Sequence, residues 1–258
     1  MKEFIKTYWK TLLFFAVVGI VGGFFVGLYL LDSYPQEIQD QLIAELNGFD
    51  EIPVDVLVAI VTAVQSAGYG LILGGAGIYL SKKIGLWKDE RQLTKQPLLI
   101  SLVASVVGGL CMILPDLLFF NGYSEIIKNS YATKPSLDYI IASVTYGAVI
   151  EEVMLRLFMM SLVAFILYKI FEKKNQTPSV KILIIANVVS ALLFALGHLP
   201  STIMMIGTSP LIIARCFILN GGLGLIFGYL YQKYGLRYAM IAHGGCHIVS
   251  KLIWVLFI

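Results

Sequence analysis

The sequence predicts an all-α protein, a polytopic bundle of transmembrane helices with about seven spans and an eighth possible. Of its 258 residues, 58% are hydrophobic and only 14% are charged. The mean hydropathy is +0.83, well outside the range of a soluble globular domain. Seven stretches reach the roughly 20 mostly apolar residues that a span requires. The chain is therefore expected to be an integral membrane protein.

The predicted spans follow one another along the whole chain. The first begins with lysines, but it is long and has no small-residue cleavage site, so we expect a retained span and not a signal peptide. The spans are predicted at residues 9–31, 54–80, 98–120, 139–170, 182–206, 211–231 and 238–258.

Positive charges are concentrated in alternate loops between the spans. Because loops rich in Lys and Arg stay on the cytoplasmic side, the N-terminus is predicted to be cytoplasmic and the C-terminus external. The excess of Lys over Arg favours a bacterial source, so we expect a multi-pass protein of a bacterial cell membrane. The basic residues of these loops are Lys82, Lys83, Lys88, Arg91 and Lys95, then Lys173, Lys174 and Lys181, then Lys233 and Arg237.

The acidic loop between the first two spans contains an amphipathic stretch. Apolar residues recur there at helical spacing, which predicts a short helix that lies on the membrane surface and does not cross it. The stretch covers residues 35–48, with Ile38, Leu42, Ile43 and Leu46 on one face.

Glycines also recur at helical spacing within the spans, which favours closely packed helices. They are Gly19, Gly23 and Gly27 in the first span, Gly70 and Gly74 in the second, and Gly221, Gly224 and Gly228 in the sixth.

Charge and cysteine usage exclude two other classes. The net charge is only +3 and no basic patch is evident, so nucleic acid is not expected as a partner. The three cysteines, Cys111, Cys216 and Cys246, lie in apolar segments without regular spacing, so they do not form a disulfide framework.

Two adjacent carboxylates and an arginine stand out in the fourth predicted span. Ionised side chains are costly in hydrocarbon, so three of them in one apolar segment predict a function. Glu151 and Glu152 project about 100° apart on a helix and cannot serve the same role. Arg156 follows Glu152 at the spacing of an ion pair along one face. We therefore expect a structural Glu152–Arg156 pair and a Glu151 that is free for chemistry; the alternative is a wet helix end without function.

The three histidines of the chain all fall within predicted spans. His243 and His247 share one face of the last span, and Lys251 follows one turn later. Together with the embedded carboxylates, these polar positions predict a water-holding cavity between spans four, five and seven. The fifth span contributes a polar stripe of Asn187, Ser190, Phe194 and His198.

The axial positions of these groups do not agree in an ideal bundle, so we expect span ends or tilts that differ by several residues, or helices that are broken or offset. Counting about 1.5 Å per residue places His243 near the cytoplasmic end of its span and His198 toward the outer end, with Glu151 between them. Pro200 further predicts an early end of the fifth helix.

The predicted cavity suits hydrolysis of an amide bond. Glu151 can take a proton from water, His198 can position that water or move the proton, and donors can stabilise an oxyanion. No serine occurs in a nucleophile-elbow context. Cys246 lies about 60° to 100° from the neighbouring histidines around the helix, which disfavours a cysteine nucleophile.

The same residues resemble the three motifs of the CAAX protease and bacteriocin-processing family of intramembrane proteases, also called the Abi family. Glu151-Glu152-x-x-x-Arg156, Phe194-x-x-x-His198 and a third motif that begins at His243 occur in the family's order within residues 138–251. The resemblance implies that Glu151 is the general base and that His198 assists it. It also implies that His243 and the residue four positions later form the water or oxyanion site. The family has Asn or Asp at that last position, whereas this chain has His247.

From these observations we predict N-terminal transmembrane helices with a surface amphipathic loop over residues 1–137 and a catalytic transmembrane domain over residues 138–258. We expect an intramembrane endopeptidase that needs no cofactor and acts on a membrane-associated peptide or protein in the lipid bilayer. Peptide maturation or bacteriocin immunity is its expected setting. The predicted catalytic residues are Glu151, His198, His243 and His247, supported by Glu152, Arg156 and Phe194.

Three alternatives stay open. Zinc could bind the four predicted catalytic residues, which offer one oxygen and three nitrogen ligands. The protein could be a non-catalytic binding or regulatory protein, as in bacteriocin self-immunity or the regulation of a sensor kinase. It could also be a proton- or ion-coupled transporter, although no inverted repeat is evident.

Overall fold

The structure is a computed structural model and describes residues 2–46, 52–88 and 92–258. Helices make up 86% of it, and no β-strand occurs in these three ranges. Seven helices in the same ranges are long and apolar enough to cross a membrane, which confirms the predicted polytopic bundle. They are Lys2–Ser33, Val54–Lys83, Lys95–Gly122, Leu137–Phe171, Val180–Ile206, Pro210–Tyr234 and Leu236–Phe257.

Several of these spans are built from more than one helical segment, because π-helical turns (labelled η) interrupt the α-helix. In chain order the elements are α1 (Lys2–Ser33), α2 (Gln36–Leu46), α3 (Val54–Gly68), η1 (Tyr69–Leu73), α4 (Gly74–Lys83), α5 (Lys95–Leu118), the 3₁₀ turn η2 (Phe120–Gly122), α6 (Glu125–Ser130), α7 (Leu137–Ala142), η3 (Ser143–Glu151), η4 (Val153–Met160), α8 (Ser161–Phe171), α9 (Val180–Ile206), α10 (Pro210–Cys216), η5 (Phe217–Gly221), α11 (Gly222–Tyr234) and α12 (Leu236–Phe257).

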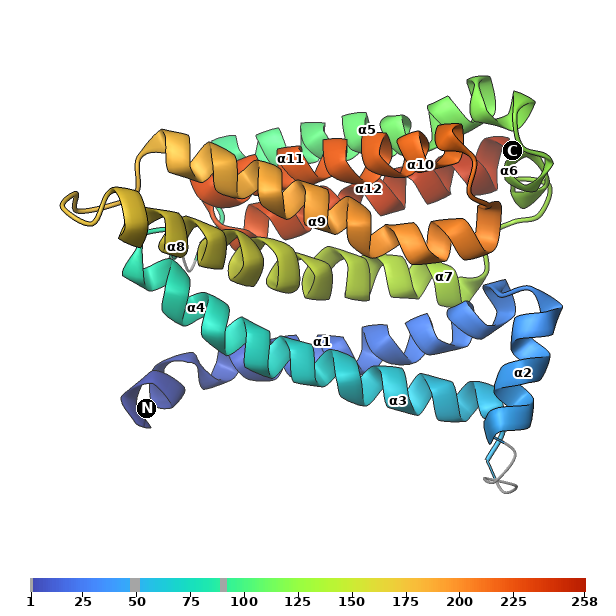
Figure 1. Cartoon of the computed structure of the whole chain (residues 1–258), viewed down its shortest axis with the longest axis horizontal. Coiled ribbons are helices and arrows are strands. Elements are labelled where there is room, and N and C mark those ends of the chain that lie inside the picture. The colour runs from blue at the N-terminus through green and yellow to red at the C-terminus, as the bar shows by residue number, and fades with distance from the viewer. Residues whose placement is uncertain (1, 47–51, 89–91) are drawn as a thin grey trace.

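The two chain ends lie at opposite ends of the bundle, which we call the N-side and the C-side (Figure 1). The lysine-rich ends of α4 and α8 lie on the N-side, as the predicted topology requires. Which side faces the cytoplasm stays a prediction. Arg91 of the second loop lies outside the described residues.

A helix is present at the predicted amphipathic stretch as α2, which contacts α3 on the C-side (Figure 1), and its position on the membrane surface stays a prediction. Its first turn contains Glu37, and the apolar side chain of Ile43 is 42% exposed. Residue 48, the predicted end of this stretch, lies outside the described residues.

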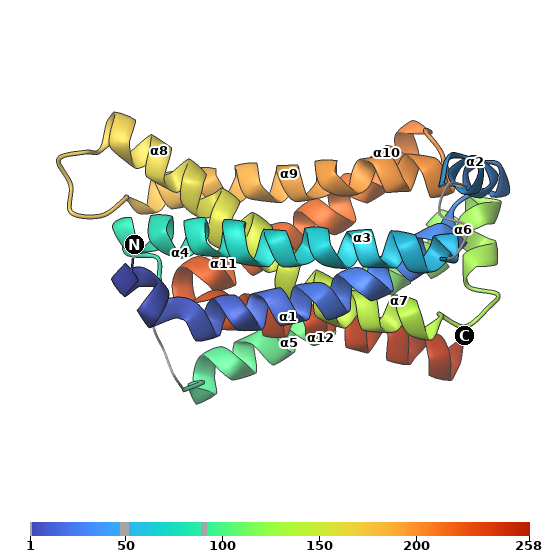
Figure 2. The same ribbon diagram turned by 90° about the horizontal axis from the view of Figure 1, so that it is seen from below.

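The fourth span lies at the centre of the bundle and is inclined to its neighbours. Figure 2 shows it crossing behind α1 and α3, from α7 beside α12 to α8 beside α9. Its π-helical middle, η3 and η4, contacts α1, α4, α9 and α12. The central helix therefore brings residues 143–160 against most other spans.

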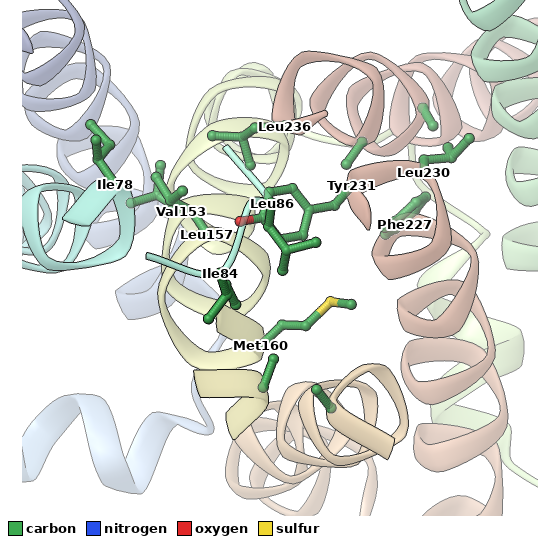
Figure 3. Packing of buried hydrophobic residues seen from close by; sticks show 14 of the residues in the cluster. Ile78, Ile84, Leu86, Val153, Leu157, Met160, Phe227, Leu230, Tyr231 and Leu236 are labelled. Atoms are coloured by element: carbon green, nitrogen blue, oxygen red, sulfur yellow. The ribbon is translucent and has the colours of Figure 1, made fainter. Parts of the chain in front are cut away.

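The main hydrophobic core surrounds η4. Val153, Leu157 and Met160 lie on one face of this segment and are fully buried. Figure 3 shows them between Ile78 of α4 and Phe227 of α11. This close packing holds η4 in place, and with it the buried Arg156 that it carries.

The predicted glycine contacts are present between the first two spans. A Cβ atom added at Gly27 would lie 2.5 Å from Cα of Ala59, and one at Gly19 would lie 2.7 Å from the carbonyl oxygen of Ser66. Both neighbours are backbone atoms of α3, so they cannot move aside singly. Close backbone packing of α1 on α3 therefore depends on these glycines.

We expect Gly27→Ala to lower the free energy of unfolding by about 1–3 kcal/mol, because the new methyl group overpacks the α1–α3 contact. The measurement is thermal unfolding of the purified protein in detergent. Gly68→Ala is the matched control, because a Cβ there meets nothing within 4 Å. A Gly27→Ala protein as stable as the Gly68→Ala protein would contradict the expectation.

Candidate active site

The embedded Glu-Glu-Arg sequence lies where η3 meets η4. Glu151 ends η3, and Glu152 separates the two π-helical segments. Such turns are uncommon and frequent at functional sites, because the extra residue per turn changes which side chains share a face. The local structure therefore differs from the regular helix assumed in placing these side chains 100° apart.

Glu152 and Arg156 form the predicted ion pair in the interior. Oε1 of Glu152 lies 3.0 Å from Nη1 of Arg156, and both side chains are fully buried. That N–H is not aligned as a hydrogen bond, whereas Nη2 of Arg156 donates to the carbonyl oxygen of Gly224 at 3.1 Å. The guanidinium also lies over the rings of Phe194, at 4.6 Å, and Phe227, at 5.5 Å.

His243 connects the two glutamates. Its Nδ1 lies 2.8 Å from Oε1 of Glu152, and its Nε2 lies 3.7 Å from Oε2 of Glu151. The ring is stacked between Phe227, at 4.5 Å between centroids, and His247, at 5.1 Å. Because a carboxylate can only accept, Nδ1 donates to Glu152, and in the neutral imidazole Nε2 carries a lone pair.

His198 is oriented in a similar way from α9. Its Nδ1 lies 3.0 Å from the carbonyl oxygen of Phe194, so Nδ1 carries the hydrogen. Its Nε2 lies 3.8 Å from Oε1 of Glu151. The edge-to-face contact with the Phe194 ring, at 4.7 Å, further holds the imidazole.

The Glu151 carboxylate thus faces one imidazole with each oxygen. Both separations exceed hydrogen-bond length and suit a bridging water, which could donate to the carboxylate and to an imidazole lone pair. The Glu151 side chain is 18% exposed and that of His198 36% exposed, whereas Glu152 is fully buried. The two adjacent glutamates therefore differ in access as well as in partners.

These groups line a cavity of about 310 Å³, which the sequence predicted between spans four, five and seven. Glu151, His198, His243 and His247 all contribute to its wall. Tyr29, Tyr139, Ser143, Ser201 and Met205 also line it, and they lie near the C-side ends of α1, α7 and α9. A larger cavity of about 1010 Å³ lies between α1, α5 and α12, but none of the predicted catalytic residues lines it.

Two expectations about the fifth span are wrong. Its helix does not end early at Pro200 but continues as α9 to Ile206. The first two residues of its polar stripe do not line the cavity either. Asn187 donates to the carbonyl oxygen of Leu225 at 3.0 Å, and Ser190 donates to that of Leu155 at 2.7 Å. These two side chains hold neighbouring helices together.

The three catalytic groups meet despite the disagreement in their axial positions, as interrupted or tilted helices allow. Glu151 lies within 3.8 Å of His198 and within 3.7 Å of His243. Two features reconcile the positions. The π-helical turns of η3 hold more residues per turn, so the count of 1.5 Å per residue fails there. The fourth span is also inclined across the bundle (Figure 2).

The sequence did not identify a second buried ion pair on the C-side. Arg215 of α10 donates from Nε to Oδ1 of Asp116 in α5 at 2.6 Å, and the hydroxyl of Tyr131 donates to Oδ2 of Asp116 at 2.9 Å. The cavity-lining amide Asn220 was missed as well. The cost of polar groups in an apolar span, which singled out Glu151, would also have found these residues.

The donor set near Glu151 can be compared with a zinc site. Lone pairs on Nε2 of His198 and His243, together with a carboxylate, are ligands that catalytic zinc uses. Within the described residues, no group of three or more His, Cys, Asp or Glu side chains has the spacing of a metal site. His247 also lines the cavity, and its Nδ1 lies 3.3 Å from Nζ of Lys251.

Comparison with protein families bears on the same part of the chain. Residues 134–249 match a family model described as "Type II CAAX prenyl endopeptidase Rce1-like". This range contains all seven predicted site residues, and the match confirms the resemblance to CAAX proteases. No curated protein and no solved structure matches the chain.

Proposed function

From the match of residues 134–249 to the Rce1-like family model, we propose that Glu151 is the general base of an intramembrane endopeptidase, with His198 assisting. The observation that carries the proposal is the position of the Glu151 carboxylate, 3.8 and 3.7 Å from two imidazole Nε2 atoms within one cavity. A base, a place for water and oriented proton acceptors are the groups that amide hydrolysis requires.

The proposed reaction follows from these positions. A water between Glu151 and the imidazoles attacks the carbonyl carbon of the scissile bond while the carboxylate takes one of its protons. The tetrahedral intermediate then collapses, the C–N bond breaks, and the amine leaves with a proton returned by Glu151 or passed through His198. One peptide and one water become a new carboxylate end and a new amino end.

Glu152 and Arg156 have a supporting role in this proposal. Glu152 accepts from Nδ1 of His243 and so keeps the Nε2 lone pair directed at Glu151. Arg156 neutralises Glu152 and lies on the rings of Phe194 and Phe227, which also contact the two histidines. The three motifs thus act on one another through direct contacts.

We propose a membrane-associated peptide, or the end of a membrane-anchored protein, as the substrate. A cavity of about 310 Å³ is at the lower end of ligand-site volumes and has room for a short extended segment but not for a folded domain. If the N-terminus is cytoplasmic, the C-side residues of the cavity are external, which favours a secreted peptide, as in peptide maturation or bacteriocin immunity. The family description itself names prenylated CAAX ends.

Comparative peptidomics tests the function and the substrate together. Cells that produce the wild-type protein are compared with cells that produce Glu151→Ala, and Glu125→Ala is the matched control on an exposed helix. We expect specific cleavage products in the wild-type and control cells, and uncut precursors with Glu151→Ala. Identical peptide profiles in all three would contradict the proposal and favour a binding protein.

We further propose that the reaction needs no metal. Bound to Glu151, His198 and His243, zinc would polarise a water, which Glu151 acting as base makes unnecessary. We expect the purified protein to keep its cleavage activity after dialysis against a strong chelator, as measured with the peptide found above. Loss of activity on chelation that zinc restores, with one zinc bound per chain, would contradict this.

A further inference from the structure

The last position of the third motif is occupied by an imidazole instead of an amide or carboxylate, and the structure gives this residue a partner. Nζ of Lys251 lies 3.3 Å from Nδ1 of His247, one helical turn away on α12. Lys251 is buried, with 5% exposure, and its ammonium lies 4.1 Å from the centroid of the Tyr139 ring. It does not line the cavity, whereas His247 does.

This contact determines where His247 carries its proton. In its ammonium form Lys251 has donors and no acceptor, so Nδ1 of His247 then accepts the hydrogen bond. The hydrogen of the neutral imidazole then lies on Nε2. A second proton, on Nδ1, would be directed at the ammonium, so Lys251 also disfavours the charged imidazolium.

The Nε2–H so defined lies beside the proposed base. A Cβ atom at Gly147 would lie 3.3 Å from Nε2 of His247 and 3.8 Å from Oε2 of Glu151. Both groups therefore border the bare backbone of Gly147 in the cavity wall. A carbonyl group placed there would lie close to both the base and an N–H donor.

We propose that Lys251 is a positioning residue, which holds His247 as a neutral imidazole whose Nε2–H binds the carbonyl oxygen of the scissile bond. This inference rests on the proposed endopeptidase function. In it, His247 supplies the donor that an asparagine amide would supply, and Lys251 fixes the tautomer that an amide does not need. The stacking of His247 on His243 holds the plane of the ring.

The test is a double-mutant cycle on cleavage of an internally quenched peptide substrate. Prenylated and unprenylated forms of the peptide are first compared with the wild-type protein, and the form that is cleaved faster is used. We expect Lys251→Met to lower kcat about tenfold with KM changed less than twofold, because an imidazole without this contact can rotate as well as change tautomer, so its Nε2–H is directed into the cavity for only part of the time. In a His247→Asn background, where an amide supplies the donor without the help of Lys251, Lys251→Met should have no further effect on kcat.

Two further variants separate this role from a structural one. His247→Phe keeps a ring that can stack on His243 but has no donor, and we expect kcat to fall about a hundredfold or more, the usual effect of losing an oxyanion donor. Thermal unfolding in detergent checks that each variant folds. If Lys251→Met does not fold, the contrast between His247→Asn and His247→Phe alone decides the donor role.

The outcomes are distinct. Equal losses from Lys251→Met in the wild-type and His247→Asn backgrounds, or full activity of His247→Phe, would overturn the inference about Lys251 and His247. Cleavage that survives Glu151→Gln would instead overturn the proposed function on which it rests.

Discussion

Glu151→Gln is expected to lower kcat at least a hundredfold, because an amide of nearly the same shape cannot take a proton from water. Its environment favours a clean result. The side chain is partly exposed in the cavity, and its contacts with His198 and His243 are longer than hydrogen bonds, so the substitution leaves no buried charge unpaired. The measurement is the steady-state cleavage of the quenched peptide by purified protein in detergent or in vesicles.

The companion variant is His198→Ala, which should also abolish most cleavage while the protein remains inserted and folded. Glu125→Gln on α6 is the control, since this carboxylate is 76% exposed and its ion-pair partner, Lys128, is also on the surface. A Glu151→Gln protein with wild-type kcat would show that another group is the base. Loss of activity together with a lower thermal stability would mean that the variant is inactive because it is poorly folded. Activity and thermal stability are therefore measured on the same preparation.

Arg156→Met is expected to lower the free energy of unfolding by about 3–5 kcal/mol, because it leaves the fully buried Glu152 carboxylate without its cation. Methionine keeps the unbranched apolar stem of the side chain, but it is shorter and also removes the guanidinium from the rings of Phe194 and Phe227. The measurement is thermal or denaturant unfolding in detergent.

The matched variant is the double substitution Glu152→Gln with Arg156→Met. It removes both charges, and the amide oxygen of the introduced glutamine can still accept from Nδ1 of His243, as Glu152 does. We expect it to recover most of the lost stability, because a buried ion pair replaced on both sides is often nearly neutral. A single Arg156→Met variant as stable as wild type would show that the pair is dispensable to the fold.

Much of the fold follows from the sequence because transmembrane helices are constrained so strongly. Backbone N–H and C=O groups in a bilayer must form their hydrogen bonds within each segment, so a long apolar stretch is expected to form a helix. All seven predicted spans are present, and their ends differ by a few residues where the helices extend beyond the apolar core. The glycines of the first span likewise predicted the close contact with α3.

The candidate site was predicted in its residues more than in its arrangement. Charged and imidazole groups in apolar segments are costly enough to stand out, which is why Glu151, His198 and His243 could be found one by one. Asn187 and Ser190 carry the same signal, yet they hold backbone carbonyls of other helices and do not line the cavity. Cost alone does not distinguish a polar group that binds water from one that binds a neighbouring helix.

The sequence by itself determined the seven-span helical class, the resemblance of residues 134–249 to CAAX proteases and the Glu152–Arg156 pair, all of which depend on local composition or spacing. Only the tertiary structure decided that His243 contacts both glutamates and that Lys251 contacts His247 at the edge of the cavity. These contacts depend on the inclination of the fourth span and on its π-helical turns. Both result from packing among several spans, which no single segment of sequence encodes.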